Sequence, residues 1–141
     1  MTQAMPKSYI KLYWRIWLMI IACLLILRVY FIEEDFAYTL FNFYMIPTWI
    51  AIMVLNIIEG YKLRTYLEEN HHQTWEKITN VPGFGSGGYN GFRALPFIYS
   101  DDNLSDPILK ELKLNYKRFI KLILTVFFTM PLLFTVIVML P

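Results

Sequence analysis

The sequence predicts an all-α integral membrane protein with three transmembrane helices and a cytoplasmic helical loop. Two observations lead to this fold class. First, the chain of 141 residues is 57% hydrophobic and only 17% charged, whereas an average soluble domain carries about 25% charged residues. A small soluble domain has no interior large enough for so much apolar surface. Second, the apolar residues concentrate in three segments of about 20 residues, the length of a helix that crosses the hydrocarbon core.

The predicted spans cover residues 14–32, 36–58 and 119–140. The basic residues before the first span resemble the start of a signal peptide, but no small-residue cleavage site follows, so we expect the span to be retained. The other two spans contain Pro47 and Pro131. A proline frees the carbonyl one turn earlier, and we expect nearby threonine hydroxyls to help satisfy the backbone there.

Basic residues gather beside the same ends of the spans. They flank the start of the first span, follow the second and precede the third: Lys7, Lys11, Arg15, Lys62, Arg64, Lys117, Arg118 and Lys121. The connection between the first two spans carries only acids, Glu33, Glu34 and Asp35. The positive-inside rule therefore places the N-terminus and residues 60–118 in the cytoplasm, and the C-terminus on the extracytoplasmic side.

The sequence divides into three parts. Residues 1–60 form an N-terminal arm and a two-helix membrane hairpin, and residues 61–106 form a cytoplasmic helix and a Gly/Pro-rich loop. Residues 107–141 form an amphipathic helix that continues into the third span. Asp106 and Pro107 mark the start of this last helix, because aspartate is a good N-cap and proline suits the first helical position.

The cytoplasmic part begins as a helix that continues out of the membrane over residues 59–78, since the stretch from Tyr61 to Leu67 contains no helix breaker. Residues 81–91 are rich in glycine and proline and predict a turn. A short apolar piece, residues 92–99, follows. In the turn, a formal match to the dinucleotide-binding pattern G-x-G-x-x-G lacks the preceding strand and the following helix. We therefore expect a flexible connection at Gly83, Gly85 and Gly88.

Four residues after the second span form the only cluster with the chemistry of metal ligands: Glu68, Glu69, His71 and His72. Glu68 and His72 share a helical face, which suits a two-ligand site. No third donor stands nearby, and adjacent histidines point about 100° apart on a helix. We expect a solvated helix face, no bound metal and no cofactor.

Arg28 is the most informative charge inside a span, because ionisable groups at depth are expensive and are usually paired or functional. It stands close to Glu33 and Glu34, so its side chain can extend to the outer interface and meet an acid. The alternative is that it binds an anion or a partner helix. Cys23 is the only cysteine, which excludes an intrachain disulfide.

The sequence offers no catalytic pattern. Its serines are scattered, without a histidine or an acid at a recognisable spacing. The net charge of +2 is too small to argue for binding of nucleic acid. We therefore expect neither an enzyme nor a nucleic-acid-binding protein.

The second half of the chain resembles a known group of proteins. The order of landmarks is Tyr66-Leu67-Glu68-Glu69-Asn70-His71, then Trp75-Glu76-Lys77-Ile78, a glycine-rich break, Asp106-Pro107 and a basic-edged final helix. This order is similar to that of small bacterial membrane proteins of the universal stress protein B type. Those proteins typically have two spans, so the third span is a departure. The resemblance implies a setting in the bacterial inner membrane and carries over no site residues.

The predicted function is a non-enzymatic accessory or scaffold subunit that binds a protein partner through its cytoplasmic loop. The loop is rich in aromatic side chains, a type enriched in the centres of interfaces: Trp75, Phe84, Tyr89, Phe92, Phe97 and Tyr99. The competing interpretation is that these rings lie among lipid headgroups. A channel or transporter subunit, with a pore formed by oligomerisation, is the alternative function. The expected partners are membrane lipid and either a membrane protein or further copies of this chain.

Overall fold

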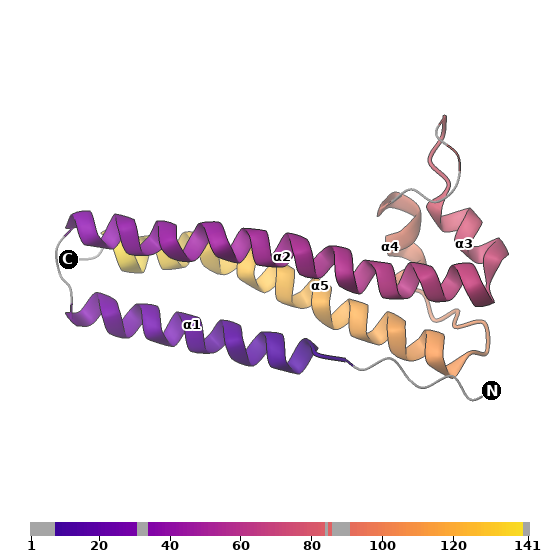
Figure 1. Ribbon diagram of the computed structural model, residues 1–141, viewed down its shortest axis with the longest axis horizontal. Coiled ribbons are helices and arrows are strands. Elements are labelled where there is room, and N and C mark those ends of the chain that lie inside the picture. The colour runs from indigo at the N-terminus through magenta and orange to yellow at the C-terminus, as the bar shows by residue number, and fades with distance from the viewer. Residues whose placement is uncertain (1–7, 31–33, 84, 86–90, 140–141) are drawn as a thin grey trace. The chain divides into compact units, whose positions relative to one another are not determined.

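The computed structural model describes residues 8–30, 34–83, 85 and 91–139. Its helices are α1 (Ile10–Tyr30), α2 (Glu34–Asn70), α3 (His72–Thr79), α4 (Gly91–Tyr99) and α5 (Pro107–Phe134), followed by a π-helix, η1 (Thr135–Met139) (Figure 1). These residues form no β-strand, only an isolated antiparallel bridge between Val81 and Gly85. The all-α fold class is therefore confirmed for the described part of the chain.

Three of the helices are long and apolar enough to cross a membrane: Ile10–Tyr30, Phe36–Asn70 and Pro107–Met139. The predicted spans fall on these helices, apart from residues 31, 32 and 140, which lie outside the described residues. A span needs about 20 residues, and α2 alone has 37. The charged end of α2 and the charged start of α5 therefore extend beyond the helix length that is needed to cross the hydrocarbon core.

The chain forms two compact units, and α2 and α5 contribute to both. The three-helix unit consists of Ser8–Leu55 and Ile120–Pro141, and the loop unit contains Asn56–Phe119. The predicted division into residues 1–60, 61–106 and 107–141 follows the order of the chain. The compact units instead join segments that are distant in sequence, because two long helices run through both.

A hydrogen-bonded aromatic pair lies inside the three-helix unit. Trp17 of α1 donates its Nε1–H to the hydroxyl of Tyr44 on α2 at 3.0 Å, and both side chains are buried. The side chain of Thr48, one turn further along α2, also hydrogen-bonds to Tyr44. Buried tryptophan and tyrosine normally have such partners, because an unpaired polar group in apolar surroundings is costly. Elsewhere in the unit, Phe41 of α2 meets Phe134 of α5 edge-on, with ring centroids 5.2 Å apart.

The outer surface of the three-helix unit is apolar. Large hydrophobic side chains on each of its helices are strongly exposed, among them Met19, Phe43, Met53, Phe128 and Leu132. Phe43 is 75% exposed. Soluble proteins rarely tolerate contiguous apolar surface of this kind, whereas lipid tails cover it without cost.

Arg28 is held by the backbone at the end of the three-helix unit. Its Nε–H donates to the carbonyl oxygen of Ile137 at 2.6 Å. Ile137 belongs to η1, where the wider π-helical turn replaces the ordinary α-helical bonding. The acidic partner that the sequence predicts stays untested, because Glu33 lies outside the described residues, as does the side chain of Glu34. One partner of Arg28 is therefore a carbonyl group, and this bond ties α1 to η1.

The core of the loop unit is built from the apolar faces of its four helical segments. Its buried apolar side chains are Leu63, Leu67, Ile78, Ala94, Ile98, Leu109, Leu112, Tyr116 and Phe119. The predicted apolar face at the start of α5 is confirmed, with only Ile108 partly exposed. The Tyr116 hydroxyl donates to Oδ1 of Asn56 at 3.1 Å, one turn from Gly60, which lies beside the phenol ring.

The prediction of one helix over residues 59–78 is wrong at one point. The helix is interrupted at His71, which has φ −140° and ψ 55°, and α3 begins afresh at His72. The interruption turns the His71 side chain toward Asp106, a residue that the sequence places 35 positions away. The apolar piece 92–99, which carried no predicted conformation, forms α4 and packs against α3.

Candidate functional site

The predicted partner-binding aromatic residues differ in their burial and in their neighbours. Trp75 on α3 is half-buried and stacks on His72, with centroids 5.1 Å apart. Phe97 on α4 is half-buried and Tyr99 is exposed. Phe84 and Tyr89 lie outside the described residues, as does the side chain of Phe92. The described members therefore do not form one continuous aromatic patch.

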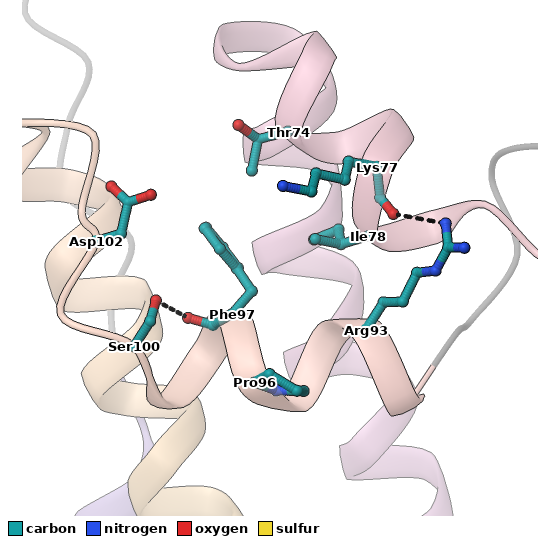
Figure 2. A pocket seen from close by; sticks show the side chains of 8 residues that line it. All are labelled: Thr74, Lys77, Ile78, Arg93, Pro96, Phe97, Ser100 and Asp102. Atoms are coloured by element: carbon teal, nitrogen blue, oxygen red, sulfur yellow. Dashed lines mark hydrogen bonds between the residues drawn. The ribbon is translucent and has the colours of Figure 1, made fainter.

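Instead, a groove of about 670 Å³ is lined by residues of α3 and α4 and of the segment that follows α4. Figure 2 shows the side chains that line it: Thr74, Lys77, Ile78, Arg93, Pro96, Phe97, Ser100 and Asp102. We call this feature the α3–α4 groove. Phe97 is the one predicted aromatic residue among these lining residues. Sequence reasoning missed the others, although Thr74, Lys77 and Ile78 share one face of a helix at i, i+3 and i+4 spacing.

The groove combines an apolar floor with basic groups. Ile78, Pro96 and Phe97 supply the apolar surface, and Ile78 is buried. The Lys77 side chain extends into the groove, above the Phe97 ring (Figure 2). Arg93 comes from the facing helix, and its Nη1 donates to the Lys77 carbonyl oxygen at 3.5 Å. Two cations from two helices therefore flank one apolar surface.

A third cation lies beneath the groove. Lys113 of α5 is only 1% exposed. Its ammonium donates to the carbonyl oxygens of Ser100 at 3.0 Å and Asp102 at 2.6 Å, and to the Ser100 hydroxyl at 3.2 Å. It also lies 4.3 Å from the centre of the Phe97 ring. These contacts satisfy all three ammonium protons and fasten the end of α4 to α5.

Asp106 forms a second polar cluster in the loop unit. Its Oδ1 accepts the backbone N–H of Ile108 at 2.8 Å and of Leu109 at 3.2 Å, so it caps α5 as predicted. Its Oδ2 accepts the Tyr66 hydroxyl at 2.7 Å and lies 2.8 Å from Nε2 of His71. Burial favours the neutral acid, but the bonds from His71, Tyr66 and the two amides outweigh it and lower the pKa of Asp106 from 3.8 to about 2.

In the described part of the loop, these contacts leave few side chains that could act in catalysis or hold a metal ion. The Ser100 hydroxyl donates to the Phe97 carbonyl oxygen at 2.7 Å and accepts from Lys113, so no base stands ready to activate it. No group of three histidine, cysteine, aspartate or glutamate residues among the described positions is placed to hold a metal ion. His71 contacts Asp106 rather than facing solvent with Glu68 and Glu69, which are exposed. The absence of a bound metal stays a prediction.

No protein-family model, curated protein or solved structure matches the chain. The arrangement in the loop unit therefore has to be interpreted from its own geometry.

Proposed function

We propose that the protein is a non-enzymatic accessory or scaffold subunit of the bacterial inner membrane. In this proposal it crosses the membrane three times, with the N-terminus and residues 60–118 in the cytoplasm, and binds a protein partner through the loop unit. The α3–α4 groove carries the proposal. It is the feature of the described loop that pairs a concave apolar surface with polar groups able to orient a ligand.

The use of the other polar groups supports binding over catalysis. Asp106 and His71 bond to each other, Tyr66 bonds to Asp106, and Lys113 is fully engaged with carbonyl and hydroxyl oxygens. Groups that stabilise the fold in this way are not poised to exchange protons with a substrate. Lys77 and Arg93 differ, because neither forms an ion pair with another residue in the described ranges.

The test fills the groove without removing any packing. Thr74→Trp places a bulky side chain in the groove, whereas Glu76→Trp adds the same side chain at an exposed position of α3 that does not line it. We expect a stoichiometric partner to co-purify from native membranes with the unaltered chain and with Glu76→Trp, and to be depleted with Thr74→Trp. Quantitative mass spectrometry measures the ratio.

Equal partner recovery from both variants contradicts the proposal and moves the interface elsewhere. Recovery of the unaltered chain without any stoichiometric protein partner also contradicts it.

A second candidate function rests on the three-helix unit. An apolar hollow of about 550 Å³ lies there beside Pro47, with Tyr13, Trp17, Ile52 and Leu122 among its lining residues. Such a surface suits a helix from a second copy, and repetition of that contact around a ring would build a pore. Native mass spectrometry of the purified protein separates the two candidates, because a closed homo-oligomer without a partner supports the pore.

A further inference from the structure

We infer that the α3–α4 groove binds an acidic-apolar segment of the partner, in which one carboxylate is flanked by an aliphatic or aromatic side chain. This inference rests on the proposed function and names the chemistry of its ligand.

The charges around the groove favour an anionic group. The Lys77 ammonium projects into the groove beside Thr74 (Figure 2), where it can donate to a carboxylate. Arg93 adds a second cation from the opposite helix. Lys113 lies below Phe97, where low exposure leaves its positive charge poorly screened by water. Three cations from three helices thus act on one small surface, and the carboxylates of Asp102 and Asp101 offset part of the Lys113 charge.

The groove is not uniformly basic, and this limits the kind of anion. Asp102 stands on the side of the groove opposite Arg93 (Figure 2). Its carboxylate repels a polyanion such as a nucleotide triphosphate or a nucleic-acid backbone, which binds best to continuous positive charge. The same carboxylate can accept an N–H from a peptide. One negative group near Lys77 and a donor near Asp102 match a protein segment that carries a single acid.

The floor of the groove requires an apolar neighbour for that acid. Ile78, Pro96 and Phe97 present apolar surface between the two charged ends. One face of the Phe97 ring is taken by the Lys113 ammonium, and the ring projects into the groove (Figure 2). A ligand without an apolar side chain leaves this surface exposed to water. It loses the hydrophobic contribution to the free energy of binding, about 25 cal/mol for each Å² of apolar surface buried.

A lipid phosphate carries a comparable charge, but the mixed lining of the groove favours a protein. Asp102 can accept an N–H, and a peptide backbone supplies such a donor beside an acidic side chain. A lipid phosphate group carries no N–H of its own, and its charge is repelled by the same carboxylate.

Photo-crosslinking from the groove tests the inference. The full-length protein, with a photoreactive phenylalanine analogue in place of the groove-lining Phe97, is irradiated in native membranes and the attached peptide is sequenced. We expect an adduct to one protein, with an Asp or Glu within about four residues of the attachment point. Lys77→Glu should lower the adduct yield at least about fivefold. Lys77→Arg and the exposed control Lys110→Glu should leave the yield unchanged.

Each other outcome is decisive. An adduct to a protein segment that lacks an acid, or a yield indifferent to Lys77→Glu, overturns the inference and leaves the proposed function standing. Adducts only to phospholipid or to a second copy overturn both. The absence of any adduct while a partner still co-purifies excludes the groove as the contact.

Discussion

At the scale of single residues, the carboxylate of Asp106 makes several of the contacts that stabilise the loop unit. It caps α5, accepts the Tyr66 hydroxyl and pairs with His71. Each contact favours the ionised form, so the fold of the loop unit is coupled to the charge of one side chain. The cap was predictable, because Asp-Pro before an apolar periodic run is a local signal. The other two contacts join residues 35 and 40 positions apart, and no local pattern reports such a distance.

The depressed pKa of Asp106 has a defined pH dependence. Because the folded-state pKa is about 2 and the ordinary value is 3.8, the stabilisation is complete above about pH 4 and is lost as the pH falls toward 2. The difference is worth about 2 kcal/mol. Hydrogen exchange at the first amides of α5 measures it. We expect Asp106→Asn to destabilise these amides at pH 6 and to flatten their pH dependence between pH 4 and 2. An unchanged pH dependence in the variant would assign the effect to another acid.

At the scale of elements, the positions of the long helices could be predicted from the sequence, but the positions of their interruptions could not. Hydropathy and the N-cap located α1, α2 and α5, because the signal repeats over many residues. The break at His71 and the formation of α4 are decided by contacts with distant segments, which override local propensity. The same limit applies to the α3–α4 groove. Lys77 and Arg93 are unremarkable in sequence, and only packing of α3 on α4 brings them together.

The π-helix η1 that follows α5 accepts a hydrogen bond from a side chain of α1. Arg28→Leu removes the donor to the Ile137 carbonyl oxygen, and an unsatisfied buried acceptor costs about 1–3 kcal/mol. We expect a lower thermal midpoint in detergent for this variant, followed by circular dichroism. Leu25→Ala, at an exposed position of the same helix, serves as the control and should shift the midpoint less. A midpoint unchanged by Arg28→Leu would show that the bond contributes nothing.

The threonines near Pro131 were expected to bond to the carbonyl that the proline frees, and their hydrogen bonds differ from this prediction. Thr125, Thr129 and Thr135 do donate to carbonyl oxygens three or four residues earlier. Their acceptors belong to Lys121, Thr125, Val126 and Pro131, not to Phe127, whose carbonyl the proline frees. The hydroxyls therefore satisfy themselves within the helix rather than repair the proline site.

At the scale of the whole molecule, the distribution of basic residues predicts a topology that a reporter can check. A fusion after Pro141 should behave as extracytoplasmic and an insertion near Ser86 as cytoplasmic. Paired alkaline phosphatase and fluorescent-protein fusions measure the two sides. If both sites report the same side, the three-span topology is wrong, and the first apolar helix lies along the membrane surface.

The buried ammonium of Lys113 also allows the opening of the loop unit to be followed by chemical labelling. Amine-reactive reagents attack the unprotonated, solvent-accessible form, and Lys113 is 1% exposed with all its protons engaged. Lys110 is exposed, does not line the α3–α4 groove and labels at once, so each molecule carries its own internal standard. The rate at which Lys113 acquires label relative to Lys110 therefore reports how often α4 leaves α5, and a bound partner that slows only this rate must hold α4 in place.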